Sequence, residues 1–355
     1  MKITKIEAWL VELKLEEPYA ISYETIDVAI NMMLRIETNQ GITGYGCAAP
    51  DEHVTGETPH GNLHAIEDAA KPLLQGADPF RSTKLIEELK TKIGSQPSAL
   101  AAVDMALFDI LGKYARLPLW KLLGGFRDRI KTSVTIGILP EEETVKRAND
   151  WIAQGFKCLK LKGGNDVESD IVRVIKVREA VGKNIELSFD ANQGYSVDQC
   201  LNFLEQTRQV KLEFIEQPTP KGELDLLGRV TSNAPIPVMA DESLLNLSDV
   251  FHLARHNLAD MVNVKLMKVG GIAEAIQIDS VARSAGLDVM IGCMDESALS
   301  IAAGLHFALA RPNVCYADLD GHIGLLNDPF AGAVILRDGV LFPNNKPGLG
   351  YPSSE

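Results

Sequence analysis

The stretch Cys158-Leu-Lys-Leu-Lys162 alternates like a β-strand and carries two lysines on one of its faces. Lys160 and Lys162 point to one side of this strand, and Leu159 and Leu161 point to the other. Two ammonium groups on one face of a buried strand are unfavourable unless acidic partners compensate for them. The same pattern in isolation also fits an edge strand with two solvated lysines. Polar residues that recur at regular intervals downstream favour the buried strand.

From Lys131 onward, short β-type runs alternate with amphipathic helical segments. The predicted strands are Thr132–Ile136, Cys158–Lys162, Ile185–Asp190, Leu212–Glu216, Pro237–Asp241, Met261–Met267, Val289–Met294 and Asn313–Asp318. The predicted helices include Glu142–Gln154, Asp166–Val181, Val197–Gln206 and Ile272–Ala285. Repeated βα units indicate parallel strands, and seven or eight of them predict a closed α/β barrel.

The residues before this barrel are predicted to form a separate α+β unit. Its predicted strands are Lys2–Glu12, Ala29–Thr38 and Ile42–Cys47, and its predicted helices are Asn62–Leu74, Arg81–Lys92 and Ser98–Tyr114. Two polar stretches, Glu17–Asp27 and Asp51–Gly61, are expected to be exposed loops that serve binding. We predict a capping domain over residues 1–125, a barrel over 126–320, and a C-terminal segment over 321–355 that folds back on the capping domain.

A charged residue stands at the carboxyl end of five consecutive predicted barrel strands. These residues are Lys162, Asp190, Glu216, Asp241 and Lys268. The steps between them are 28, 26, 25 and 27 residues, which is one βα unit each time. Since active sites of such barrels lie where the strands end, the five side chains are expected to share one rim.

Three carboxylates on consecutive strands, Asp190, Glu216 and Asp241, repel one another unless a cation lies between them. Carboxylate oxygens at an open rim suit Mg²⁺, which keeps positions free for substrate or water. Each acid taken alone also fits the N-cap of the helix that follows its strand. The common register of the three favours a metal site.

Lysines flank this carboxylate series on both sides, with Lys162 on the strand before it and Lys268 after the strand that follows it. One amine on each face of a bound substrate is what reversible proton transfer beside a carboxylate requires, with the metal stabilising an enediolate. Lys160 is expected to assist the substrate carboxylate. Lys265 competes with Lys268 for the second role, but Lys268 is preferred because it precedes the pair Gly270-Gly271 at the predicted strand end.

On these residues the sequence resembles the enolase superfamily, in the subgroup of muconate-lactonising enzymes. The resemblance covers the whole chain and rests on the Lys-x-Lys pair, the Asp/Glu/Asp series and the Lys-x-Gly-Gly motif that begins at Lys268. It implies a (β/α)7β modified TIM barrel with an N-terminal α+β capping domain that the C-terminal segment completes. It also implies Mg²⁺ as cofactor, bound by the three acids, and Lys162 and Lys268 as the acid/base pair.

Two later stretches look like those of dipeptide epimerases: Gly292-Cys-Met-Asp-Glu-Ser297 and the D-x-D of Ala317-Asp-Leu-Asp-Gly321. The resemblance implies that Asp318 and Asp320 bind the α-ammonium group of a dipeptide. With a period of two residues both carboxylates face the same way, although Asp-x-Asp-Gly also suits a solvated turn. Thr135 on the first barrel strand is expected to line the same site.

The loop Tyr19–Thr25 departs from the family members that act on Ala-Glu, because it lacks the arginine that pairs with the glutamate side chain. Glu24 stands near that point, and Asp51 and Asp295 are expected to add negative charge. We therefore predict a dipeptide whose C-terminal residue is cationic or neutral. The alternative is that Glu24 points to solvent.

These inferences predict an isomerase, a dipeptide epimerase with a small-molecule substrate. Cycloisomerisation and o-succinylbenzoate synthesis are the alternatives on the same scaffold, and a barrel that only binds a ligand is a third. The formal net charge of −13 argues against nucleic-acid and anionic-membrane partners. Five scattered cysteines without C-x-x-C spacing and the absence of a long apolar run favour the cytoplasm. A homo-oligomer is compatible with the sequence, which does not determine the oligomeric state.

Overall fold

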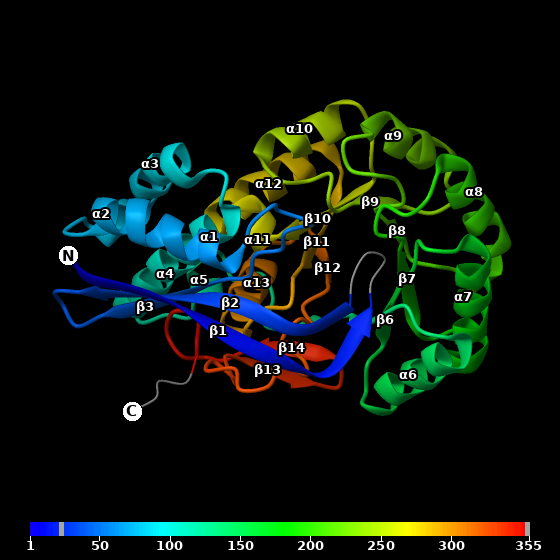
Figure 1. Ribbon diagram of the computed structural model, residues 1–355, viewed down its shortest axis with the longest axis horizontal. Helices are drawn as coiled ribbons and strands as arrows, with labels where there is room; N and C mark the ends of the chain where they lie inside the picture. Colours follow the sequence, from blue (N-terminus) through cyan, green and yellow to red (C-terminus); the bar gives the residue numbers. More distant parts are fainter. Residues whose placement is uncertain (21–24, 352–355) are drawn as a thin grey trace.

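The computed structural model, which describes residues 1–20 and 25–351, consists of a barrel with an α+β domain at its side (Figure 1). The blue and cyan N-terminal elements lie on the left of the view, and the green to orange βα units form the curved wall on the right. The fold is a (β/α)7β modified TIM barrel with an N-terminal α+β capping domain, as expected from the family resemblance.

The capping domain contains an antiparallel sheet in the order β1-β2-β3, with β1 at Ile3–Ala20, β2 at Thr25–Thr38 and β3 at Thr43–Ala48. The expectation of a loop over Glu17–Asp27 is largely wrong, because Tyr19 pairs with Ile26 and Ala20 with Thr25. Backbone pairing extends the hairpin as far as Ala20 and Thr25. Glu24 lies outside the described residues.

Helices cover one face of this sheet (Figure 1). They are α1 (Pro59–His64), the π-helical turn Ala65–Ala70, α2 (Lys71–Leu74), the 3-10 turn Pro79–Arg81, α3 (Ser82–Ile93), α4 (Pro97–Ala115) and α5 (Leu119–Leu122). Helix α4 packs closely on β3, where a Cβ atom added to Gly46 would lie 1.9 Å from the carbonyl oxygen of Ala102. Glycine at this position therefore lets the helix approach the sheet.

Eight parallel strands, β5 to β12 in chain order, form the barrel sheet. They are β5 (Val134–Ile136), β6 (Cys158–Lys162), β7 (Glu186–Asp190), β8 (Ile215–Glu216), β9 (Val238–Ala240), β10 (Met261–Lys265), β11 (Asp288–Gly292) and β12 (Val314–Ala317). The backbone N–H of Ser133 donates to the carbonyl oxygen of Ala317 at 2.9 Å, which joins the first strand to the last. The sheet is thus closed.

The connecting helices lie outside the strands (Figure 1). They are α6 (Glu141–Ala153), α7 (Val167–Val181), α8 (Val197–Gln206), the 3-10 turn Arg208–Val210, α9 (Leu224–Asn233), α10 (Leu247–Arg255), the short α11 (Leu266–Val269), α12 (Ile272–Ala285) and α13 (Ala298–Ala310). Helix α13 is buried along its whole length, since the capping domain covers its outer side.

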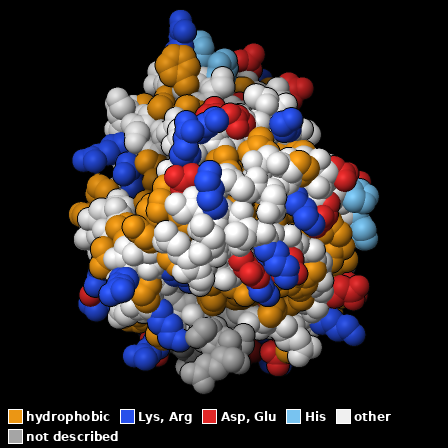
Figure 2. All heavy atoms as spheres, turned by 90° about the vertical axis from the view of Figure 1, so that its left-hand side faces the viewer, with side chains coloured by type: hydrophobic (Ala, Val, Ile, Leu, Met, Phe, Trp, Pro, Cys, Tyr) orange, Lys and Arg blue, Asp and Glu red, His pale blue; other side chains and the backbone are white. Residues whose placement is uncertain are grey.

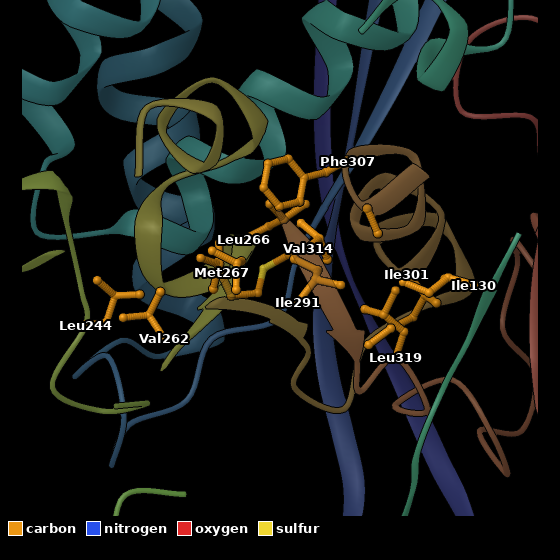
Figure 3. Packing of buried hydrophobic residues seen from close by; sticks show 14 of the residues in the cluster. Ile130, Leu244, Val262, Leu266, Met267, Ile291, Ile301, Phe307, Val314 and Leu319 are labelled. Carbon is orange, nitrogen blue, oxygen red and sulfur yellow. The ribbon is translucent and has the colours of Figure 1, made fainter. Parts of the chain in front are cut away.

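A continuous apolar core joins α13 to the last barrel strands (Figure 3). Phe307 and Ile301 of α13 are fully buried in one cluster with Ile291 of β11 and Val314 of β12. Burial of each such side chain contributes about 1.5–3 kcal/mol relative to exposure. This packing fixes the strand ends that carry the candidate site.

The C-terminal residues contact both the barrel and the capping domain. Strand β13 (Val334–Arg337) pairs with β14 (Val340–Pro343), and β14 pairs with β4 (Ile130–Lys131). Leu325 forms an isolated antiparallel bridge with Leu15 of β1, and the rings of Tyr351 and Tyr45 meet edge to face at 5.2 Å. The hairpin β1–β2 is therefore bound to the chain that follows the barrel.

The face of the molecule on the capping-domain side has Lys and Arg side chains scattered over it, without a single basic patch (Figure 2). Within residues 1–20 and 25–351, no helix has the length and apolar character needed to cross a bilayer.

Candidate active site

A cavity of about 440 Å³ opens at the carboxyl ends of the barrel strands. Side chains from the strand ends, from the hairpin of the capping domain and from the segment after β12 form its wall. Its charged wall residues are Glu16, Glu17, Asp51, Arg147, Lys160, Lys162, Glu242, Lys265, Asp295, Asp318 and Asp320. The cavity thus lies at the rim where the sequence predicted the site.

The three predicted metal-binding acids meet at the base of this rim. Asp190 ends β7 and pairs in register with Glu216, which ends β8, while Asp241 follows β9 directly. One carboxylate oxygen of each lies within 4.8 Å of the others, and all three side chains are buried. Consecutive parallel strands therefore bring acids from distant parts of the sequence to one point.

Neighbouring amides orient these carboxylates. Asn263 on β10 donates from Nδ2 to Glu216 Oε1 at 2.7 Å. The side-chain oxygen of Gln217 accepts hydrogen bonds from the backbone N–H groups of Asp241 at 2.9 Å and Ser243 at 3.1 Å. The acids are held toward a shared centre rather than toward solvent.

The electrostatics of this centre suit a divalent cation. Burial, together with the neighbouring Asp190 carboxylate, raises the pKa of Glu216 to about 8. Three ionised carboxylates so close together are unstable without compensating positive charge. Oxygen-only ligands at a rim open to substrate fit Mg²⁺.

Two lysines reach opposite ends of the acidic series. Lys162 Nζ lies 2.7 Å from Asp190 Oδ2, and Lys265 Nζ lies 2.8 Å from Asp241 Oδ2. Their strands, β6 and β10, flank the three strands of the acids in the sheet. The two amines therefore approach the centre from opposite sides.

Lys160 fills the space between the acids and the last strand. Its Nζ atom lies 2.8 Å from Glu216 Oε2, 2.9 Å from Asp318 Oδ2 and 3.1 Å from Asp190 Oδ2. Burial by itself lowers the pKa of Lys160, but the surrounding carboxylates outweigh it and raise the pKa well above that of a free lysine. The amine is thus held as a cation.

The expectation that the sixth strand runs on to Lys268 is wrong. Strand β10 ends at Lys265, and a single helical turn, α11, follows it and ends at Gly270 in the left-handed conformation. Lys268 lies within this turn, 1 % exposed, and donates to the carbonyl oxygen of Asn263 at 3.1 Å. Lys265 lines the cavity, whereas Lys268 belongs to the packed layer behind it.

The two lysines also differ in their charge environment. Lys268 contacts the other carboxylate oxygen of Asp241, but burial dominates and lowers the pKa of Lys268. For Lys265, burial also acts to lower the pKa, yet the Asp241 carboxylate outweighs it and raises the pKa. No sequence pattern distinguishes these two lysines, because both lie in the same largely apolar run.

The D-x-D acids line the cavity beside the first strand. Asp318 contacts Lys160 and the hydroxyl of Ser133, and Asp320 Oδ2 accepts a hydrogen bond from the backbone N–H of Thr135 at 2.6 Å. Burial, together with the neighbouring Asp318 carboxylate, raises the pKa of Asp320 to about 7. A substrate cation at this point would favour the charged form of Asp320.

Of the residues predicted to choose the substrate side chain, Asp51 and Asp295 line the cavity. Asp51 sits in a turn in which its Oδ1 atom accepts a hydrogen bond from the backbone N–H of Val54 at 2.8 Å. Glu24, the third of them, lies outside the described residues. Asn192 and Glu242, which were not predicted as site residues, also line the cavity. Asn192 lies two residues after Asp190 and Glu242 directly after Asp241, and these positions beside the predicted metal-binding acids are the signal that could have found them.

Family models match nearly the whole chain. Residues 5–124 match the N-terminal domain of mandelate racemase and muconate lactonizing enzymes, and residues 143–355 match the enolase C-terminal domain-like family. The chain belongs to the enolase superfamily. Within this superfamily, its sequence relatives include epimerases and racemases at 32–42% identity over nearly the whole chain, so the chain is an isomerase that acts on amino acid derivatives.

One such relative is the L-Lys-D/L-Arg epimerase of Desulforapulum autotrophicum, 42% identical over 99% of both chains. The dipeptide epimerase of Methylococcus capsulatus was solved with Mg and the dipeptide L-Arg-D-Lys. It is 40% identical to this chain with a TM-score of 0.95, and the match covers 99% of this chain and 100% of that chain. The substrate-liganded L-Ala-D/L-Glu epimerase of Bacillus subtilis is 33% identical with a TM-score of 0.97 over 99% of both chains. Similarity of this extent places the chain in the dipeptide epimerase group of the enolase superfamily.

Proposed function

We propose that this enolase-superfamily member is an Mg²⁺-dependent dipeptide epimerase that inverts the Cα of the C-terminal residue. The observation that carries the proposal is the placement of Lys162 and Lys265, which both line one cavity, at opposite ends of the Asp190–Glu216–Asp241 series. The Mg in the Methylococcus capsulatus structure supports the choice of cofactor.

Asp190, Glu216 and Asp241 would hold the ion. When bound there, Mg²⁺ supplies positive charge that offsets these carboxylates and stabilises negative charge developing on the substrate carboxylate. Lys160, held among the same acids, adds a fixed positive charge on the same side of the cavity. Its role is to bind the substrate carboxylate rather than to move a proton, because three carboxylates already hold its Nζ atom in place.

The two lysines of the rim move the proton. On one face of the substrate a neutral amine accepts the proton of Cα, and on the other face an ammonium group donates a proton to the same carbon. The bond broken and the bond formed are both C–H bonds, so configuration inverts and the net charge of the enzyme is unchanged. Lys162 and Lys265 exchange these two roles when the opposite epimer binds.

Lys265 takes the place that the sequence analysis gave to Lys268. A general base must reach the proton that it removes, through direct contact or one water. Lys265 lies on the cavity wall, whereas Lys268 is enclosed by α11, Asp241 and Asn263. We propose that Lys268 positions the Asp241 carboxylate.

Asp318 and Asp320 would bind the α-ammonium group of the dipeptide. Both line the cavity directly after β12, and the backbone N–H of Thr135 on β5 donates to Asp320. A paired acidic site has no evident use for the substrates of cycloisomerases or o-succinylbenzoate synthases, which lack an ammonium group. The D-x-D pair therefore favours a dipeptide.

The charge of the cavity mouth favours a cationic C-terminal side chain. Among the described residues of the capping domain, those that line the cavity are acidic or apolar, and none is basic: Leu15, Glu16, Glu17, Pro18, Ile26, Asp51 and Val54. Asp295 adds a carboxylate from the loop after β11, and the positive charge of Arg147 on α6 is paired with Glu17. The name L-Lys-D/L-Arg epimerase of the Desulforapulum autotrophicum relative supports this preference.

Steady-state kinetics on L-Ala-L-Lys, L-Ala-L-Leu and L-Ala-L-Glu with Mg²⁺ test the proposal. We expect the highest kcat/KM for L-Ala-L-Lys and the lowest for L-Ala-L-Glu, because an acidic side chain would face acidic walls. A higher kcat/KM for L-Ala-L-Glu contradicts the charge argument, and no epimerisation of any of the three contradicts the proposed activity.

A further inference from the structure

A buried polar network lies behind Lys162 and outside the substrate cavity. Its members are Asp170 and Arg173 on α7 and Tyr195 after β7, all at most 4 % exposed. Arg173 forms an ion pair with Asp170 Oδ1 and donates from Nη2 to the carbonyl oxygen of Lys162 at 2.7 Å. Asp170 Oδ2 accepts hydrogen bonds from Tyr195 Oη at 2.6 Å and from the backbone N–H of Gly164 at 2.8 Å.

This network binds the backbone on both sides of the bend that follows Lys162. Gly163 N–H donates to the carbonyl oxygen of Asp190 at 2.9 Å, and Gly164 has a φ of +106°. A Cβ atom at Gly164 would lie 2.1 Å from the carbonyl oxygen of Ala191, so the bend packs directly on the end of β7. The network therefore fixes the end of β6, which carries Lys162, against the end of β7, which carries Asp190.

A buried ion pair is a costly way to hold a loop, because both charges lose their hydration. None of the three side chains belongs to the wall of the substrate cavity. Their hydrogen bonds end on the backbone of Lys162 and Gly164, so their effect on chemistry passes through the position of Lys162.

We infer that Asp170, Arg173 and Tyr195 are positioning residues for Lys162 and not for Lys265. The inference rests on the proposed function, in which each lysine serves one face of Cα. Lys265 stands on β10, four strands away in the sheet, where it forms an ion pair with Asp241. Disturbing the network should therefore impair proton transfer on one face more than on the other.

Exchange of the Cα proton with solvent reveals this asymmetry, whereas epimerisation rates do not. A variant must lower kcat/KM for epimerisation by the same factor in both directions, because no variant changes the equilibrium constant between the epimers. Exchange with retention needs only one lysine, which removes the proton and returns a deuteron to the same face. The exchange rate of each epimer in D₂O therefore reports on the lysine that removes its Cα proton.

The experiment measures initial Cα–H exchange of L-Ala-L-Lys and L-Ala-D-Lys in D₂O with Mg²⁺ by NMR. Lys162→Ala first identifies the epimer whose exchange depends on Lys162. Arg173→Lys keeps the charge beside Asp170 but loses the planar donor group that reaches the Lys162 carbonyl. Since displacement of a catalytic group by about 1 Å costs on the order of 100-fold, we expect exchange of that epimer to slow at least about tenfold more than exchange of the other.

Arg178→Lys is the matched control, because Arg178 lies on the same helix and donates to the carbonyl oxygens of Val210, Gly182 and Ile185 at its far end. We expect equal effects of this control on both epimers. Tyr195→Phe removes the hydrogen bond to Asp170 and should slow exchange of the same epimer more than that of the other, by a smaller factor than Arg173→Lys does. This second variant tests the inference if Arg173→Lys does not fold. Equal slowing of both epimers by a folded network variant overturns the inference. Absence of exchange in the unmodified enzyme instead overturns the proposed function.

Discussion

Lys162 and Lys265 bind the two ends of one carboxylate series, the first at 2.7 Å from Asp190 and the second at 2.8 Å from Asp241. The relationship follows from the order of the strands, since β6 and β10 flank the strands of the three acids. A substrate beside these acids has one amine on each side. Inversion at a carbon needs this arrangement, because the proton leaves one face and arrives at the other.

Removal of one metal-binding carboxylate should weaken Mg²⁺ binding strongly. In Glu216→Gln a charged ligand becomes neutral while Asn263 still finds an oxygen at this position. We expect the Mg²⁺ affinity to fall by more than about 100-fold, because even indirect partners of metal ligands contribute about 10–100-fold. Isothermal titration calorimetry measures the affinity, with Asp225→Asn on the exposed face of α9 as control. An unchanged affinity would show that the three acids do not hold the ion.

Asp295→Asn should reduce the preference for a cationic C-terminal residue. The variant removes one negative charge from the cavity wall and keeps the shape of the side chain. A contact between charged groups contributes about 1.5–3 kcal/mol, so kcat/KM for L-Ala-L-Lys should fall about tenfold or more while that for L-Ala-L-Leu changes little. Asp288→Asn, at the opposite end of β11, is the matched control. An equal loss of kcat/KM for both dipeptides would show that Asp295 acts on the part of the substrate that both share, or on folding, and not on the C-terminal side chain.

His306 should make the folded state less stable in weak acid. Its Nδ1 accepts a hydrogen bond from the backbone N–H of Trp120 at 3.0 Å, so the proton of the neutral ring lies on Nε2, which contacts the carbonyl oxygen of Leu349 at 3.2 Å. Burial lowers the pKa of His306 to about 4, whereas an unfolded histidine has a pKa of about 6.5. As the pH falls from 6.5 to 4, the unfolded chain gains a proton that the folded chain does not accept.

The free energy of unfolding should therefore decrease by about 2 kcal/mol between pH 7 and pH 5 because of this residue. Urea unfolding at both pH values measures the change. His306→Gln, which keeps an acceptor for Trp120, should reduce the pH dependence, and His256→Gln on the exposed end of α10 should not. The same pH dependence in His306→Gln would show that other groups are responsible.

The barrel and its acidic rim were predictable because each depends on a periodic pattern. The repeat of βα units predicts parallel strands, and the spacing of Asp190, Glu216 and Asp241 predicts a common rim. Family resemblance added the Mg²⁺ and the roles of the lysines and the D-x-D acids, which spacing alone does not provide. The capping sheet followed from alternating residues in β1 and β2.

Two parts of the prediction failed for local reasons. The polar stretch Glu17–Asp27 is mostly strand, because backbone pairing between β1 and β2 does not depend on the polarity of their side chains. The run Met261–Val269 is apolar throughout apart from Asn263 and its lysines, so nothing in it marks the change from strand to the helical turn α11 after Lys265. The positioning network of α7 depends on a bend of the backbone, and a sequence pattern does not reveal such contacts.

The assignment of the two bases is the central claim, and hydrogen exchange in three variants tests it most directly. NMR follows loss of the Cα–H signal of L-Ala-L-Lys and L-Ala-D-Lys in D₂O with Mg²⁺, for Lys162→Ala, Lys265→Ala and Lys268→Ala. We predict that Lys162→Ala abolishes exchange of one epimer, that Lys265→Ala abolishes exchange of the other, and that Lys268→Ala retains exchange of both. Loss of exchange of a single epimer in Lys268→Ala, with both retained in Lys265→Ala, would contradict the account.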